Sequence, residues 1–285
     1  MVGVLGVSAS AILVRFSQAP SGVTAAYRLG WTVLLLLPVV LLRCRAELRR
    51  VTARDLVLCG ASGVLLALHF LTWFESLKRT SVASSTVLVS TEVIFTALGF
   101  ALFLHGKIPR LGVWAILLAF GGSALLALSG GGGAGELSGN LLALAAASAA
   151  AVYTLIGRIQ RGHLSTTVYT FLTFLTYLAC FLTLLLGTAA AGTPLTGYGG
   201  REWLIGLALA VLCTLLGHSL FSWCLKYLSP SYVSAAKLCE PVFSSLAAIP
   251  LFGEVPGPLQ LAGGAAVLGA VLLYTWAERE KTPAG

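Results

Sequence analysis

The sequence predicts an all-α membrane protein whose ten transmembrane helices form two inverted five-helix repeats around a central cavity. The first observation is composition: 58% of the 285 residues are hydrophobic and 10% are charged, and the mean hydropathy is +0.93. A water-soluble domain carries about 25% charged residues. The second is that the apolar residues form runs of membrane-spanning length, and the third is that one such stretch occurs twice. Strands are not expected, because the runs lack two-residue alternation.

Each predicted helix is an apolar run, since a bilayer core requires roughly 20 apolar residues per helix. The ten runs span 2–16, 22–42, 56–75, 80–103, 110–129, 139–157, 166–187, 202–225, 231–252 and 257–277. The first run is short and would cross the bilayer with a tilt or at a thin place. No basic segment precedes it, so we expect no cleavable signal peptide.

The basic residues predict the orientation of these helices. The net charge is +8, but the cations lie in the gaps between apolar runs, as in membrane proteins, which disfavours nucleic acid as a partner. With the N-terminus in the cytoplasm, twelve Lys and Arg residues fall on the cytoplasmic side and three on the other. We therefore expect a multi-pass protein of the cytoplasmic membrane with both termini inside.

A glycine-rich stretch, SGGGGAGELSG at Ser129–Gly139, divides the helices into two sets of five. It predicts a first repeat at 1–129, a linker at 130–138, a second repeat at 139–277 and a cytoplasmic tail at 278–285. It does not resemble a phosphate-binding loop, because no Gly-Lys-Ser/Thr follows. Since five is odd, the second repeat enters the membrane in the opposite orientation. Inverted repeats of this kind are typical of secondary transporters, which bind substrate between the repeats near the midplane.

The duplicated stretch supports this division. At an offset of 148 residues, Leu77 aligns with Leu225 and Glu92 aligns with Glu240. Two turns, GKIP at Gly106 and GEVP at Gly253, align at an offset of 147. A carboxylate within a membrane helix costs about 2.5–3.5 kcal/mol on insertion scales, so such residues usually face a cavity or a partner.

Together these features resemble the EamA-type domains of the drug/metabolite transporter superfamily. The resemblance rests on AAYR at Ala25–Arg28, the glutamates of the fourth and ninth helices, and the GKIP and GEVP turns. It implies a ten-helix bundle around a central cavity, and transport of metabolites that vary among relatives from amino acids to sugar phosphates. Fold-level resemblance does not select one of these substrates.

Eight polar or aromatic residues within the predicted helices are candidates for substrate binding or coupling. Several share helix faces at spacings of three or four residues, and a proline follows the glutamate of the ninth helix. The candidates are Arg28, His69, Trp73, Glu92, Tyr153, His218, Lys237 and Glu240. We expect His69, Trp73, Glu92 and His218 to line one water-accessible space.

Each candidate also has a structural interpretation. The histidines fit packing roles as well as binding roles, and Lys237 fits a partner of Glu240 one turn away. Glu92 has no cation in its own helix, which favours it as the carboxylate that binds substrate or a proton. Arg28 fits either a partner of Glu92 or a side chain that extends to the interface, and we expect Arg15 to extend there.

These residues favour a carrier over an enzyme. The sequence contains no nucleotide-binding loop, no spacing typical of a metal site and no catalytic triad, so neither cofactor nor metal is expected. We expect a secondary transporter, in the direction of export, for a small polar or amphipathic metabolite such as an amino acid. Proton coupling and oligomeric state stay open, with a monomer allowed. A channel for small metabolites is the alternative, and an intramembrane hydrolase using His69 or His218 is less favoured.

Overall fold

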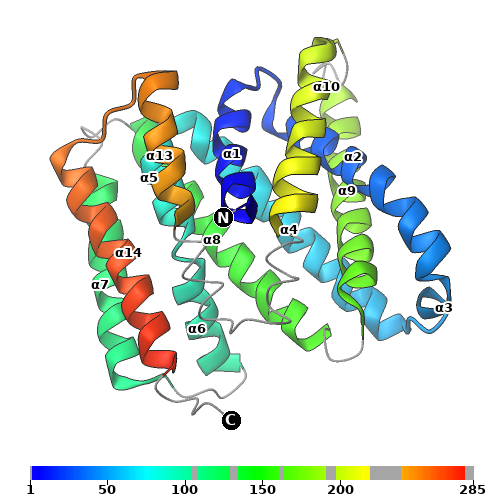
Figure 1. The fold of residues 1–285 in the computed structure, drawn as a ribbon, viewed down its shortest axis with the longest axis horizontal. Coiled ribbons are helices and arrows are strands. Elements are labelled where there is room, and N and C mark those ends of the chain that lie inside the picture. Colours follow the sequence, from blue (N-terminus) through cyan, green and yellow to red (C-terminus); the bar gives the residue numbers. More distant parts are fainter. Residues whose placement is uncertain are drawn as a thin grey trace.

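All regular structure in the described part of the chain is helical. A computed structural model describes residues 2–103, 108–128, 134–160, 164–190, 197–218 and 239–279. The helices are α1 (Val2–Phe16), α2 (Ser21–Arg43), α3 (Arg45–Leu48), α4 (Ala53–Arg79), α5 (Val82–Val89), α6 (Glu92–Phe103), α7 (Arg110–Leu128), α8 (Ala134–Gln160), α9 (Thr166–Ala190), α10 (Gly199–Ala208), the π-helix η1 (Leu209–His218), α13 (Cys239–Phe252) and α14 (Pro258–Arg279) (Figure 1).

The helix ends follow from local side-chain chemistry. Thr52 and Asp55 form a capping box at the start of α4, in which each side chain bonds the backbone amide of the other residue. Ser81 caps α5 by accepting a hydrogen bond from the Ser84 amide. Gly253 ends α13 at φ +69°, a backbone conformation that glycine adopts without steric cost.

Helices occupy all ten predicted segments where the chain is described, and their ends differ from the predicted ones by up to five residues. Residues 219–225 and 231–238 of the predicted eighth and ninth helices lie outside the described residues. The short helix α3 lies between two predicted segments, and there are two further differences.

The predicted helix 80–103 is divided into α5 and α6 by a turn at Ser90 and Thr91, where the hydroxyls of Thr86, Ser90 and Thr91 bond carbonyls of the preceding turn. Glu92 therefore starts α6 instead of lying within one long helix. Val82–Gly99 still forms one apolar span of membrane length. The second difference is that α8 begins at Ala134, inside the predicted linker. Glu136 lies in the first turn of α8, where its negative charge interacts favourably with the helix dipole.

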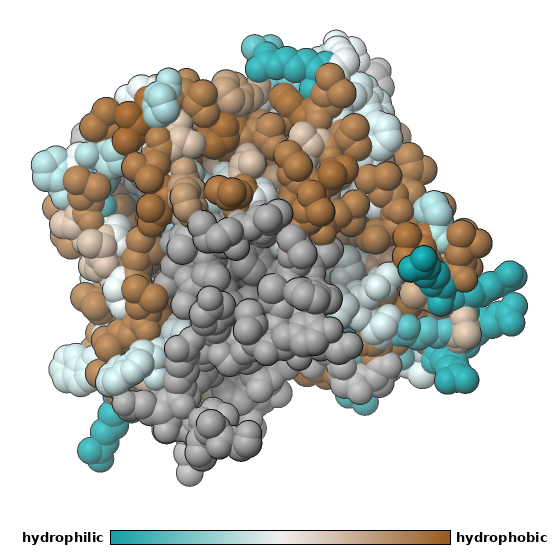
Figure 2. All heavy atoms as spheres, viewed as in Figure 1, coloured by the Kyte–Doolittle hydropathy of each residue, from teal (hydrophilic) through white to brown (hydrophobic). Residues whose placement is uncertain are grey.

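The surface of the bundle matches a protein that spans a membrane. Six described helices are long and apolar enough to cross one, and four shorter apolar helices accompany them. Large apolar side chains such as Leu42, Val57, Trp114 and Trp276 are more than half exposed. Figure 2 shows apolar residues over most of the upper part of one face and hydrophilic residues at the tip of α10 and around α3. The chain is therefore a membrane protein.

The bundle has two ends. The Arg15 end carries the α1–α2, α4–α5 and α13–α14 turns, and the α3 end carries the α2–α4 and α8–α9 connections (Figure 1). Long helices pack in pairs between them, chiefly α4 with α8, α7 with α14, and α1 with η1. α7 and α14 cross where Gly122 meets Gly263, so closely that a Cβ on either would lie within 3 Å of the other's carbonyl oxygen.

Candidate functional site

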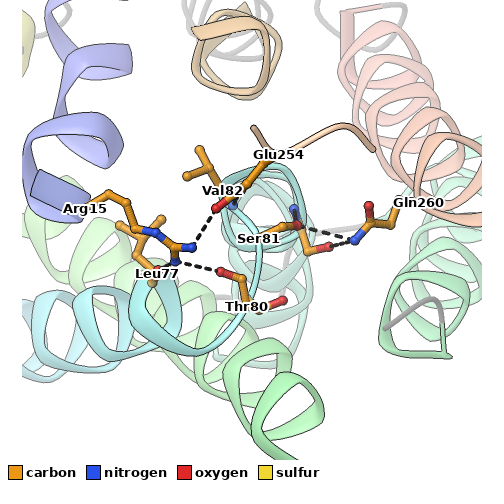
Figure 3. A network of polar contacts seen from close by, with 8 residues as sticks. Arg15, Leu77, Thr80, Ser81, Val82, Glu254 and Gln260 are labelled. Carbon is orange, nitrogen blue, oxygen red and sulfur yellow. Dashed lines mark hydrogen bonds and ion pairs between the residues drawn. The ribbon is translucent and has the colours of Figure 1, made fainter. Parts of the chain in front are cut away.

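An ion pair joins distant segments of the chain at the Arg15 end. Arg15, near the end of α1, bonds the Glu254 carboxylate with a nitrogen–oxygen distance of 2.6 Å, and its other guanidinium nitrogen donates to the carbonyls of Leu77 and Thr80 (Figure 3). The expectation that Arg15 extends to the membrane interface stays a prediction, and its guanidinium contacts Glu254 and the end of α4. Its side chain is 29% exposed, because the free carbonyls at the end of α4 and a carboxylate from the opposite half attract it inward.

Glu254 completes this network from the α13–α14 turn. Its second oxygen accepts a hydrogen bond of 2.7 Å from the Val82 amide at the start of α5, where the helix dipole favours a negative charge. Nearby, Gln260 of α14 donates to the hydroxyls of Ser81 and Ser84 (Figure 3). We call the contacts of Arg15, Glu254 and the Val82 amide the Arg15–Glu254 lock, because they join α1, α4, α5 and the α13–α14 turn.

A cavity of about 270 Å³ lies beside this lock. Its lining includes Ser81, Ser245, Glu254 and Gln260, so polar groups of α5, α13 and α14 face it. The sequence predicts a cavity at the centre of the bundle, whereas this one lies at the Arg15 end. Of its lining residues, only those of the GEVP turn were singled out from the sequence.

A second polar cluster surrounds Arg28, whose side chain is 1% exposed. Its Nε donates to the Thr214 hydroxyl of η1 at 2.9 Å, and its Nη1 donates to the Ser10 hydroxyl of α1 at 3.4 Å. The guanidinium carbon lies 4.1 Å from the centre of the Phe70 ring. Arg28 thus neither extends to the interface nor bonds Glu92. It is a buried cation held by neutral hydroxyls and an aromatic face.

Aromatic side chains extend from Phe70 to form one side of this cluster. Phe70 stacks against Tyr177 of α9 at 5.6 Å between ring centres and lies 6.1 Å from Trp73. The Trp73 indole nitrogen is buried and has no acceptor within the described residues. His69 stacks on Trp73 and bonds the Ala146 carbonyl of α8 at 2.9 Å. His69, Trp73 and Arg28 therefore belong to one region.

Glu240, at the start of α13, approaches the same region. Its negative charge acts electrostatically on Arg28 and on Cys213, which precedes Thr214 on η1. Its carboxylate lies beyond the 4 Å of an ion pair with Arg28. Within the described chain, the guanidinium therefore has a carboxylate nearby but not in contact.

The structure assigns the remaining candidates to other places. Glu92 is half-buried and accepts a hydrogen bond from Thr154 of α8 at 2.8 Å, with no described bond to His69 or Trp73. Tyr153 stacks on Tyr169 at 6.3 Å. His218 ends η1, but its side chain and the whole of Lys237 lie outside the described residues.

Sequence reasoning missed two buried carboxylates that lie in related positions. Asp55, at the start of α4, is 2% exposed and lies 3.3 Å from the side-chain amide nitrogen of Gln160, the last residue of α8. Glu202, at the start of α10, is 4% exposed and accepts hydrogen bonds from the Ser17 hydroxyl and the Gln18 amide at the end of α1. The sequence signal that could have identified these carboxylates is their position, because each lies in the first turn of an apolar helix.

Comparison with known proteins identifies relatives that transport small molecules. The EamA-like transporter family matches residues 1–128 and 137–276. The pseudopaline exporter CntI of Pseudomonas aeruginosa is 26% identical over 211 residues, which cover 74% of this chain and 72% of that protein. A probable terminal-alkyne amino-acid exporter of Streptantibioticus cattleyicolor is 27% identical over 232 residues, 79% of this chain and 75% of that protein. One crystal structure aligns with 99% of this chain and 96% of its own, with a TM-score of 0.66 and 18% identity, a likeness of fold alone.

Proposed function

Because the chain belongs to the EamA-like transporter family, we propose that it exports a small organic metabolite by alternating access between two inverted five-helix repeats. The family and the relatives are transporters and not enzymes. The proposed repeats are 1–129 and 139–277. The first contains α1, α2, α4, α5 with α6, and α7; the second contains α8, α9, α10 with η1, α13, and α14.

The observation that carries this proposal is the symmetry of helix packing. A two-fold relation between the repeats pairs the contacts between helices of different rank, and the most extensive contacts between the described parts of the repeats occur in such pairs. The third helix of each repeat packs on the first helix of the other repeat: α4 packs on α8, and η1 packs on α1. The third helix also packs on the second helix of the other repeat: α4 packs on α9, and α10 packs on α2. The fourth helix also packs on the first, as α6 on α8 and α13 on α1. Helices of equal rank pair directly in α2–α9, α5–α13 and α7–α14.

The buried carboxylates obey the same relation. Asp55 and Glu202 each start the third helix of a repeat, and each bonds the end of the first helix of the other repeat. They therefore lie at opposite ends of the bundle. This is the arrangement expected when the two repeats enter the membrane in opposite orientations.

Alternating access requires one end to close while the other opens, and the Arg15–Glu254 lock supplies a closure for the Arg15 end. Basic residues gather at the α3 end, at Arg45, Arg49, Arg50 and Arg54. The positive-inside rule therefore assigns the α3 end to the cytoplasm and the Arg15 end to the outside of a cytoplasmic membrane. In this orientation the lock is the outer gate of the transporter.

The direction and the class of substrate follow from the relatives by analogy. Both named relatives are exporters, one of them of an amino acid. We therefore propose outward transport of a small polar or amphipathic metabolite. Glu92 is the proposed proton-linked carboxylate, because it is half-buried and its described partner, Thr154, is neutral.

Counterflow in proteoliposomes tests this function. The purified full-length protein is reconstituted in vesicles loaded with unlabelled amino acids, and uptake of labelled amino acids is measured with and without a pH gradient. A carrier accelerates uptake when substrate is present on the opposite side, whereas a channel does not. Empty vesicles and the lipid-facing variant Trp114→Phe serve as controls. Uptake that is insensitive to trans substrate would support a channel and overturn the proposal.

A further inference from the structure

The cluster around Arg28 combines a buried cation with a buried hydrogen-bond donor that lacks an acceptor. Neutral hydroxyls engage the Nε and Nη1 atoms of Arg28, and no carboxylate of the described residues forms an ion pair with it. The buried Trp73 indole nitrogen has no acceptor among the described residues. Both side chains contact Phe70, at 4.1 Å from the guanidinium and 6.1 Å between rings. A buried donor without an acceptor is costly inside a protein, so it favours a ligand that brings one.

The charge of the cluster specifies this acceptor further. A buried cation needs a negative partner to offset the loss of hydration, and neutral hydroxyls offset it only in part. The planar guanidinium presents parallel donors whose spacing matches the two oxygens of a carboxylate. Phe70, Trp73 and Tyr177 form an apolar wall beside it, suited to a hydrocarbon side chain.

We propose that Arg28 is the anchor for the carboxylate of the transported metabolite, and that the substrate is an amphipathic carboxylate whose apolar part packs on Phe70 and Trp73. This inference rests on the proposed transport function and names its substrate class. The guanidinium is 1% exposed, so the carboxylate replaces the Thr214 and Ser10 hydroxyls as the site opens.

The location of the cluster fits a substrate site below a gate. Arg28 lies seven residues into α2, roughly 10 Å from its start at 1.5 Å per residue. Ser10 and Arg15 lie on the same helix, separated by about 8 Å along its axis. Arg28 therefore lies deeper in the bundle than the Arg15–Glu254 lock. A carboxylate bound at Arg28 and leaving towards the Arg15 end would pass the level of the lock.

Binding of three matched ligands to the full-length protein tests this inference. L-norvaline carries a carboxylate and an ammonium, L-norvalinamide has the same side chain without a carboxylate, and valerate has the carboxylate without the ammonium. Dissociation constants are measured by tryptophan fluorescence or by the shift of the unfolding midpoint. We expect norvaline to bind about tenfold or more tightly than norvalinamide, since a charge-assisted bidentate contact is lost, and we expect valerate to bind measurably.

Variants then separate binding from a structural role. In Arg28→Gln, norvaline and norvalinamide should bind equally; in Arg28→Lys, which keeps the charge but loses the paired donors, their ratio should fall severalfold. A purely structural arginine would weaken all ligands by one factor and leave the ratio unchanged. Arg79 is exposed, so Arg79→Gln serves as the control. It should show the same ratio of norvaline to norvalinamide affinity as the unmodified protein. If Arg28→Gln does not fold, Arg28→Lys decides the question by itself.

The outcomes distinguish this inference from the proposed function. Equal binding of norvaline and its amide, no binding of norvaline and valerate, or an unchanged ratio in Arg28→Lys would overturn the carboxylate anchor. Counterflow of another substrate would still support a carrier in that case. Carboxylate-selective binding without trans-stimulated uptake would instead overturn the carrier and leave the anchor in place.

Discussion

Removing one charge from the Arg15–Glu254 lock should open the Arg15 end measurably. In Glu254→Gln the side chain keeps its size, but the contacts to Arg15 at 2.6 Å and to the Val82 amide at 2.7 Å lose their ionic character. Hydrogen bonds to charged groups are worth about 1.5–3 kcal/mol and neutral ones about 0.5–1.5, so the two contacts together lose about 2 kcal/mol. The pair is 29% and 17% exposed, and solvent screening reduces this to about 1.4 kcal/mol. That change raises the open population about tenfold.

Ser244 is a suitable reporter of this opening. It is fully buried between α13 and α1, where its hydroxyl bonds the Ser8 carbonyl. We introduce Ser244→Cys in a background whose native cysteines are replaced by serine, and measure its reaction with a membrane-impermeant maleimide added at the Arg15 end. When opening is fast relative to labelling, the rate follows the open population, so Glu254→Gln should label about tenfold faster.

A second ion pair at the same end supplies the control. Glu75 pairs with Arg79 one turn away on α4 at 3.5 Å, with side chains 34% and 50% exposed, and so joins no second helix. Such a pair contributes about 0.3–0.5 kcal/mol to its own helix, and Glu75→Gln should leave the labelling rate unchanged. An unchanged rate in Glu254→Gln, or an equal increase in Glu75→Gln, would refute the gating role of the lock.

Three further predictions concern packing, coupling and topology. Gly122→Ala should destabilise the protein by about 1–3 kcal/mol in thermal unfolding, because its Cβ would lie 2.8 Å from the Gly263 carbonyl oxygen. The control Gly121→Ala places its Cβ in open space and should leave the unfolding midpoint unchanged. Equal midpoints of the two variants would contradict the close crossing of α7 and α14. Glu92→Gln should keep the fold but abolish the pH dependence of transport, and an unchanged pH profile would exclude Glu92 as the proton carrier. A tag inserted within 129–139 should be labelled from outside the cell and both termini from inside; labelling of this tag from the cytoplasm alone would contradict the inverted repeat.

The membrane helices could be predicted from the sequence because lipid imposes a simple requirement on it. Every spanning segment needs a run of apolar residues, and no other feature of the chain produces such runs. The turn before Glu92 could not be predicted in the same way. Ser90 and Thr91 are tolerated within membrane helices, and whether their hydroxyls interrupt one depends on packing with neighbouring helices.

The candidate site was predicted less completely, because its contacts join distant parts of the chain. Arg28, His69 and Trp73 were recognised as polar or aromatic residues at membrane depth, and the structure brings them to one region. Arg15 was expected at the interface, since a cation near a helix end commonly extends there. Its partner Glu254 lies 239 residues away, in a turn that local sequence marks only as a helix end.

The chemistry of the two aligned turns gives the proposed transporter unequal ends. Inverted repeats make the two ends alike in backbone arrangement, yet Lys107 stands in GKIP where Glu254 stands in GEVP. A lysine cannot accept hydrogen bonds from an arginine or from a helix N-terminus, so the Arg15–Glu254 lock has no counterpart of the same chemistry in the first turn. The empty carrier should therefore favour the state closed at the Arg15 end.

This preference for one closed state determines which end a substrate can enter first. It does not set the direction of net transport, because a difference in stability between two states of a carrier cancels over a complete cycle. The direction must come from the substrate gradient or from a coupled proton, which makes the pH dependence of Glu92→Gln the measurement that connects the architecture to export.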